Sequence, residues 1–203
     1  MDRKIYDKYQ YVDPECKYVY PNSSVLINRQ GIMDKDDATA NEHYFVSRRL
    51  IELALAPIIV KNMYDIQRIH AHLFLDLYEW AGVYREVNIS KEGKAFMAMQ
   101  SFGTGEKYID SLITDYFENA NSHSDIVFHL ARILDNLNHM HAFREGNGRT
   151  QREAIRSLAL SKGYIADIRV SDDEEIYHLY MDGTVYGRID LLEKLFDKIL
   201  EEA

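Results

Sequence analysis

The sequence predicts a mainly α-helical protein with one small β-hairpin. Apolar residues recur at intervals of three and four over most of the chain after residue 38, a spacing typical of helices that pack by one face. Residues 83–100 are the exception, because β-branched residues there flank a Lys-Glu-Gly-Lys turn and predict a hairpin. With 203 residues, 46% of them hydrophobic, the chain can bury one full core.

Caps and helix breakers divide the first part of the chain. Residues 1–38 are rich in tyrosine and are expected to form an irregular arm over the core, with the main domain at 39–203. Residues 39–42, Thr-Ala-Asn-Glu, are interpreted as a capping box at the start of a helix that Pro57 ends. A second helix is expected at 63–80.

The helical pattern continues in the second half of the chain. A third helix is expected at 106–119, and a fourth starts with Ser124 as N-cap and ends at or just before His141. Two glycines interrupt the periodicity, and the next helix is expected from Arg149 to Lys162. A short helix and a terminal helix follow, so the segment that contains the two glycines is a loop between helices.

This interhelical segment, HAFREGNGRTQR at 141–152, concentrates groups that bind anions. Backbone N–H groups around the Gly-Asn-Gly turn, at the start of a helix, can converge on one anion. Arg149 and Arg152 lie three positions apart and project from nearly the same helix face, so they can hold two phosphoryl oxygens. The segment therefore predicts a polyphosphate site in a chain whose net charge is −9.

Two residues of the same segment indicate further chemistry. Glu145 would repel an anion beside it unless Mg²⁺ bridged the carboxylate and the phosphate oxygens. His141 titrates near neutrality and could accept a proton from an attacking hydroxyl. Each feature alone has a simpler explanation as a turn, a solvated helix face or a cap. The functional prediction therefore depends on their conjunction within one short segment.

Composition and spacing count against several other classes. The negative net charge argues against direct nucleic-acid binding. No apolar run indicates a membrane span or a secretory signal, so a cytoplasmic protein is expected. The single Cys16 forms no internal disulfide or cysteine zinc cluster. His70-Ala-His72 and the pair ending at His141 are spaced by two, which separates side chains by roughly 200° on a helix, so no histidine metal site is expected.

The segment 141–152 resembles the signature of the Fic family, HxFx[D/E]GNGRxxR. Every defined position agrees: His141, Phe143, Glu145, Gly146, Asn147, Gly148, Arg149 and Arg152. Ala142 stands where most members have proline, a departure expected to affect loop stiffness. The resemblance covers roughly residues 40–200 and implies a Fic-type helical bundle with a β-hairpin, called the flap, near the active site at about 85–98.

The resemblance implies a protein adenylyltransferase, which transfers AMP from ATP to a Ser, Thr or Tyr hydroxyl of a target protein. It implies that His141 is the general base, that Phe143 anchors the loop in the core and that Glu145 holds Mg²⁺. The phosphates would be bound by Gly146, Asn147, Gly148, Arg149 and Arg152. On the flap, Lys91 and Phe96 would bind an extended segment of the target by strand addition.

Many Fic proteins are inhibited by a helix with the pattern [S/T]xxxE[G/N], whose glutamate pairs with the second motif arginine, here Arg152. Residues 114–119, TDYFEN, match by letter, but they lie inside a predicted helix where Tyr116 and Phe117 are expected in the core. A separate small antitoxin is therefore expected to supply the glutamate, as for stand-alone bacterial toxins of the family. DNA gyrase and topoisomerase IV are targets of such toxins, and host small GTPases are targets of secreted relatives.

Two alternatives stay open from the sequence. One is a nucleotide-binding regulatory module that keeps the anion site without transferring AMP. The other is a de-AMPylating hydrolase, which would need an inhibitory glutamate to activate water. The intact Arg149 and Arg152 favour AMP transfer over the phosphorylating and phosphocholine-transferring branches of the family.

Overall fold

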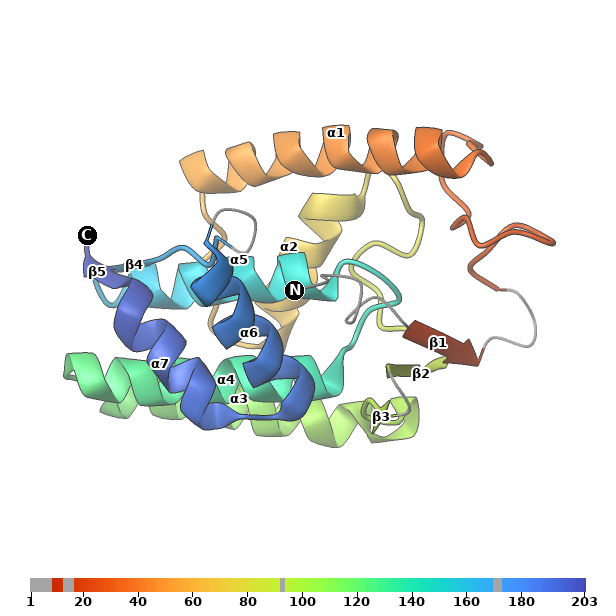
Figure 1. Ribbon diagram of the computed structural model, residues 1–203. Coiled ribbons are helices and arrows are strands. Elements are labelled where there is room, and N and C mark those ends of the chain that lie inside the picture. The colour runs from red at the N-terminus through yellow and green to blue at the C-terminus, as the bar shows by residue number, and fades with distance from the viewer. Residues whose placement is uncertain (1–8, 13–16, 92–93, 170–172) are drawn as a thin grey trace.

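A computed structural model describes residues 9–12, 17–91, 94–169 and 173–203, with only the backbone for 9–12, Lys91 and Lys94. Helices dominate these residues, which confirms the mainly α prediction (Figure 1). The α-helices are α1 (Lys35–Leu55), α2 (Met63–Phe74), α3 (Phe102–Asn119), α4 (His123–Met140), α5 (Asn147–Ser161), α6 (Glu174–Tyr186) and α7 (Ile189–Ile199).

Helix α4 is the centre of the bundle. It packs against α3, α5, α6 and α7, and its residues Leu130, Ile133 and Leu134 are fully buried. Helices α6 and α7 cover one side of it, while α1 lies across the opposite end of the molecule over α2 (Figure 1). Helix α5 packs against α4 and α2, so the loop between α4 and α5 lies next to α2.

The predicted flap is present, and part of the arm pairs with it. Strands β2 (Asn88–Lys91) and β3 (Lys94–Ala95) form the hairpin, and β1 (Tyr9–Val12) adds to the other edge of β2. The arm is thus not irregular throughout. Behind the sheet, Tyr18 is buried with Val87 and Ile89, so this part of the arm closes a small apolar cluster under the flap.

The predicted start of the first helix is wrong. Helix α1 begins at Lys35, because the Asp34 carboxylate caps the N–H groups of Asp36 and Asp37. Thr39 lies inside the helix and its hydroxyl donates to the Lys35 carbonyl. Glu42, which was expected to complete the capping box, instead accepts hydrogen bonds from Tyr78 and Arg149.

Two more boundaries differ for tertiary reasons. Helix α2 stops at Phe74, six residues before the predicted end at 80, and the following turn is held by the arm, whose Arg29 N–H donates to the Leu77 carbonyl. At the carboxyl end, β4 (Tyr164–Ala166) pairs with β5 (Leu200–Glu202), which the sequence did not predict.

No helix in the described ranges is long and apolar enough to cross a membrane.

Helix α4 is capped by Ser122 and not by the predicted Ser124. The Ser122 hydroxyl accepts from the Asp125 N–H at 3.2 Å, and the Asp125 carboxylate accepts from the Ser122 N–H at 2.9 Å, which is a complete capping box.

Replacing this cap gives a direct test of the boundary. Ser122→Ala should lower the free energy of unfolding by about 1 kcal/mol, because it leaves a helix N–H without its acceptor. Ser124→Ala, on the exposed first turn, is the matched control and should change it by less than about half as much. Urea unfolding followed by circular dichroism measures both, and equal losses would show that the cap is misassigned.

Candidate active site

His141 follows α4 as its C-cap and lies next to the flap. Its backbone is left-handed, with φ 43° and ψ 57°, a conformation that costs energy for a non-glycine residue. The His141 N–H still donates to the Leu137 carbonyl at 3.0 Å, and the ring is buried and stacks on Phe96 with centroids 3.9 Å apart. The helix end and the flap thus fix the imidazole from two sides.

Arg85, whose role is not predicted from the sequence, connects the end of α4 to the base of the flap. Its N–H donates to the Ala142 carbonyl at 2.8 Å, and its buried guanidinium lies 4.7 Å from the centre of the Phe102 ring. Burial lowers the pKa of Arg85 to about 10, so the group is still charged at neutral pH. The guanidinium donates to the backbone carbonyls of Val87, Met97, Met140 and His141. One side chain therefore joins the base of the flap to the end of α4.

Asn147 locks the loop that follows His141. Its side-chain oxygen accepts from the Phe143 N–H at 2.9 Å and its side-chain nitrogen donates to the Phe143 carbonyl at 2.7 Å. The Phe143 ring is buried in the core, as expected from the family resemblance. The amide oxygen and one amide N–H of Asn147 are thus used within the loop, which holds the side chain against Phe143.

Helix α2 packs against the loop, and its residue Phe74 requires glycine at position 146. Gly146 has φ 79°, and an added Cβ would lie 2.2 Å from Cζ of Phe74. A larger residue would therefore be strained in its backbone and would also collide with a fully buried ring. Helix α5 starts directly after this contact, so Phe74 sets where the helix begins.

His70 is a second α2 residue that supports the loop. Its Nδ1 accepts from the Gly82 N–H at 2.8 Å and its Nε2 donates to the Glu145 carbonyl at 3.0 Å. The ring also stacks on Phe143, with centroids 3.9 Å apart. Burial lowers the pKa of His70 to about 3, so the ring is neutral, and this tautomer uses both nitrogens. The sequence indicates no histidine metal site at His70, and the contacts of this ring with the loop are not predicted from the sequence.

Backbone N–H groups at the start of α5 lie where the sequence predicts an anion cradle. Thr150 is the residue whose N–H donates to the carbonyl of Gly146, at 3.0 Å, so the N–H groups of 147–149 have no acceptor within the helix. These groups and the positive end of the helix dipole favour an anion at this position.

The two motif arginines lie in different surroundings. Arg152 lies over Tyr180 of α6, with a 3.4 Å contact from Nη1 to the tyrosine hydroxyl. Arg149 instead donates to Glu42 of α1 at 2.6 Å and lies 3.5 Å from the Glu145 carboxylate. The two arginines thus have different contacts, and their joint binding of phosphate stays a prediction.

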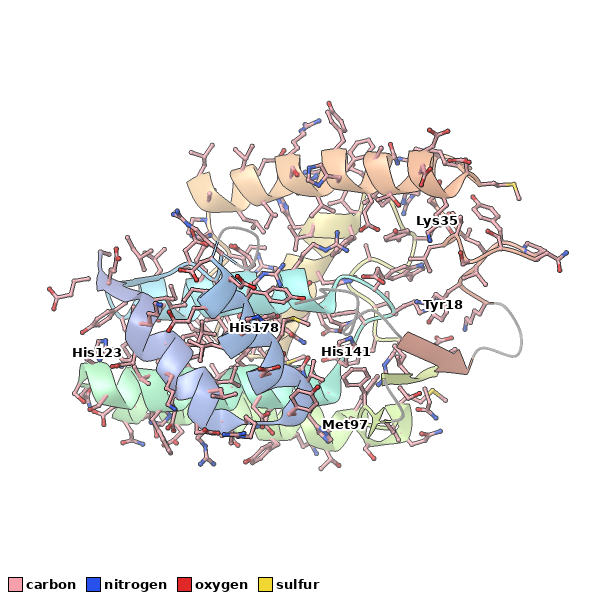
Figure 2. The ribbon with its side chains drawn as sticks, in the orientation of Figure 1. Tyr18, Lys35, Met97, His123, His141 and His178 are labelled. Carbon is pink, nitrogen blue, oxygen red and sulfur yellow. The ribbon has the colours of Figure 1, made fainter. Side chains whose placement is uncertain are left out.

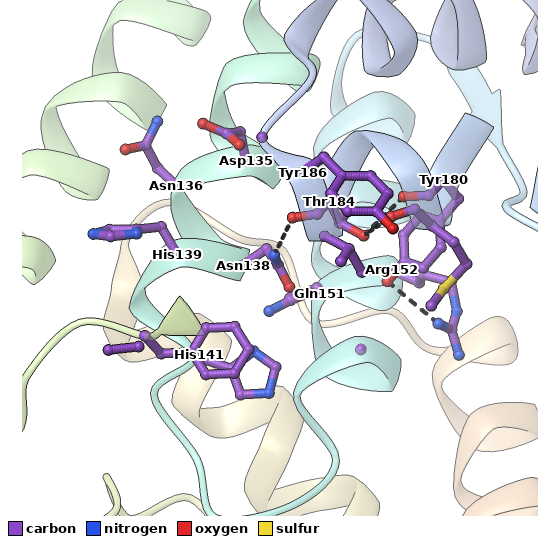
Figure 3. A pocket seen from close by; sticks show the side chains of 16 residues that line it. Asp135, Asn136, Asn138, His139, His141, Gln151, Arg152, Tyr180, Thr184 and Tyr186 are labelled. Atoms are coloured by element: carbon purple, nitrogen blue, oxygen red, sulfur yellow. Dashed lines mark hydrogen bonds between the residues drawn. The ribbon is translucent and has the colours of Figure 1, made fainter. Parts of the chain in front are cut away.

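A cavity of about 460 Å³ connects His141 with Arg152. His141 lies on one side of it and Arg152 with Tyr180 on the other, and an Asn138 amide donates to the Thr184 carbonyl in the wall (Figure 3). The remaining walls come from α4, α6 and the flap, through residues that include Asp135, Asn136, Met181, Tyr186, Ala95 and Phe96. Glu145 and Arg149 are not among the lining residues.

The surroundings of Glu145 fit a magnesium ion that is also held by phosphates. Its side chain is 38% exposed and accepts from the Gly146 N–H at 2.9 Å, beside the anion cradle. Mg²⁺ commonly uses one or two carboxylates together with water and substrate phosphates, so Glu145 could supply one of its ligands.

The flap residues predicted to bind the target have separate positions. Phe96 follows β3 and covers the His141 ring, which places it at the cavity. Lys91 ends β2, where its backbone pairs with Tyr9 and Lys94, but its side chain lies outside the described part. The turn residues Glu92 and Gly93 also lie outside the described residues. Figure 2 shows His141, Met97 and Tyr18 around the sheet of the flap.

Comparison with known proteins agrees with this geometry. Residues 62–159, from the start of α2 to the body of α5, match the Fic/DOC family. The chain thus contains a Fic/DOC domain. It is 32% identical over 195 residues to the protein adenylyltransferase VbhT of Bartonella schoenbuchensis, covering 95% of this chain but 41% of VbhT. It is 29% identical to the Fic protein of Salmonella typhimurium, with 92% of both chains covered.

Solved structures share the fold. BepC of Bartonella tribocorum, a VirB-translocated effector solved with bound AMPPNP, superposes with a TM-score of 0.79 at 21% identity, covering 93% of this chain and 98% of BepC. The Fic-type bundle and flap expected from the sequence are thus confirmed. The chain spans less than half of the length of VbhT.

The neutral His70 predicts a specific pH dependence of stability. Because its pKa falls from 6.5 in the unfolded chain to about 3 in the fold, only the unfolded chain binds the proton between these values, and stability is lost as pH falls through this window. At pH 5 the loss is about 2 kcal/mol relative to pH 7. His70→Gln should remove this part of the pH dependence.

Urea unfolding at pH 7 and pH 5 provides the measurement. His43→Gln, an exposed histidine on α1, is the control and should keep the wild-type difference between the two pH values. A wild-type loss no larger than that of His70→Gln would contradict a neutral His70.

Proposed function

We propose that this Fic protein is a protein adenylyltransferase that transfers AMP from ATP to a hydroxyl of a target protein. The observation that carries the proposal is the single cavity that joins His141, the flap and Arg152 at the amino end of α5. VbhT, which is similar over nearly the whole of this chain, is named a protein adenylyltransferase.

In the proposed reaction, the target hydroxyl oxygen attacks the α-phosphorus of ATP. A new oxygen–phosphorus bond forms, the bond to the bridging oxygen breaks, and pyrophosphate leaves. His141 accepts the hydroxyl proton, and the backbone N–H groups of 147–149 stabilise the phosphate charge. Mg²⁺, when held by Glu145, would neutralise charge that develops on the phosphates. Phe96 restricts water access to one face of the base.

The nucleotide fits the cavity with its base toward α6. Tyr180 and Met181 offer apolar surface for the base, and Arg152 lies between this wall and the helix start, where phosphates would be bound. BepC, a neighbour of the same fold, binds AMPPNP, which supports an adenine nucleotide here.

The target segment would add to the outer edge of β3. Ala95 faces Ser90 across the hairpin and the Phe96 N–H donates to Ile89, so the N–H and carbonyl of Ala95 point away from β2. β1 already fills the other edge of β2. Strand addition at Ala95 would place a target side chain close to His141.

Control by a separate antitoxin remains part of the proposal. Arg152, the expected partner of an inhibitory glutamate, has no carboxylate within ion-pair distance in the portion of the chain that the structure describes. The TDYFEN segment does not supply one, since it lies in α3 with Tyr116 buried in the core. DNA gyrase and topoisomerase IV stay candidate targets, and a cytoplasmic site of action fits the use of ATP.

His141→Ala tests the transfer. With α-labelled ATP, Mg²⁺ and cell lysate, wild type should label proteins and His141→Ala should label them at least 100-fold less, on the order of the loss expected for a general base. His178→Ala on α6 is the matched control. Equal labelling by wild type and His141→Ala would refute the transferase, nucleotide binding without labelling would indicate a regulatory module, and removal of AMP from labelled proteins would indicate a hydrolase.

A proline scan tests the docking edge. Ala95→Pro removes the outward N–H without breaking a β2 hydrogen bond, and should reduce labelling of target proteins about fivefold or more. Ala98→Pro is the matched control, because Ala98 already has φ −63°, which suits proline. Equal labelling by the two variants would place the target elsewhere.

A further inference from the structure

An ion-pair chain connects α1 with the proposed magnesium ligand. Arg149 donates to one oxygen of Glu42 at 2.6 Å, and its other terminal nitrogen lies 3.5 Å from Glu145. The second oxygen of Glu42 accepts from the Tyr78 hydroxyl. Glu42 and Arg149 are 107 positions apart in sequence, so only the fold brings them together.

Glu42 is itself firmly held. Tyr78 is buried and its ring stacks on Trp80 with centroids 4.4 Å apart. Burial, together with the neighbouring Glu42, raises the pKa of Tyr78, so its hydroxyl stays protonated and donates to the carboxylate. The Glu42 side chain is 21% exposed, which reduces screening of its charge.

The two carboxylates beside Arg149 are not equivalent. Glu42 takes the close contact, and Glu145 keeps a longer one together with a 38% exposed side chain. The Arg149 guanidinium also lies over the Phe74 ring, 4.8 Å from its centre, which limits its movement. If Glu42 lost its charge, Arg149 would pair more closely with Glu145 and compete with a cation for that carboxylate.

We propose that Glu42 is a positioning residue that engages Arg149 and thereby leaves the Glu145 carboxylate accessible to Mg²⁺. This inference rests on the proposed function, because it concerns the metal and nucleotide of that reaction. It gives Glu42, first interpreted as part of a helix cap, a role at the active site.

Calorimetric binding of α,β-methylene-ATP to the full chain, with Mg²⁺ and with EDTA, provides a test that needs no catalysis. The measured quantity is the gain in affinity that Mg²⁺ produces. Glu42→Gln should reduce this gain about tenfold, the lower end of the effect of residues that support a metal ligand. Glu52→Gln, another α1 carboxylate paired with arginine, should keep the wild-type gain.

A double-mutant cycle identifies the route of the effect. In an Arg149→Ala background, Glu42→Gln should change the Mg²⁺-dependent gain in affinity by less than about twofold, because Arg149, through which Glu42 acts, is absent. An unchanged gain in Glu42→Gln, or the same reduction with and without Arg149, would overturn the inference. Thermal unfolding without nucleotide verifies that each variant is folded.

The outcomes separate this inference from the proposed function. If wild type binds the analogue with a Mg²⁺ gain and Glu42→Gln matches it, only the positioning role fails. If wild type binds no adenine nucleotide, the proposed function fails and the inference fails with it. If the wild-type protein binds the analogue more tightly with Mg²⁺ but labels no protein, the transferase function is refuted. The effect of Glu42→Gln on the Mg²⁺-dependent affinity then still decides the positioning role.

Discussion

The site depends on one buried cation, the guanidinium of Arg85. Its bonds to four backbone carbonyls satisfy acceptors at the end of α4 and at the base of the flap. A helix end carries partial negative charge, so a cation there is favourable, and the geometry also holds His141 in its left-handed conformation. Removal of this side chain would leave several buried carbonyls without donors, a cost that a surface residue would not incur.

A second constraint acts from below the loop. Phe74 requires glycine at position 146, and His70 binds the carbonyl of Glu145, so α2 fixes the place where α5 begins. Both supports come from side chains without a role in the proposed chemistry. The motif residues can therefore be arranged for binding because their positions are set by neighbouring helices.

Sequence reasoning located the bundle, the hairpin and the motif, because these depend on local periodicity and on a contiguous pattern. It failed where distant residues decide the outcome. Thr39 and Glu42 fit a capping box by spacing, yet Asp34 is the cap and Glu42 binds Arg149. His70 and Arg85 were missed because their partners are backbone groups 75 and 56 positions away, which no local pattern encodes.

The pairing of β1 with β2 covers one edge of the flap hairpin. A hairpin alone could pair with a strand at either edge, whereas here β1 covers the β2 edge, and the β3 edge beside His141 has no strand against it among the described residues. The amino-terminal strand thus occupies the β2 edge and leaves the β3 edge beside His141 to a further strand.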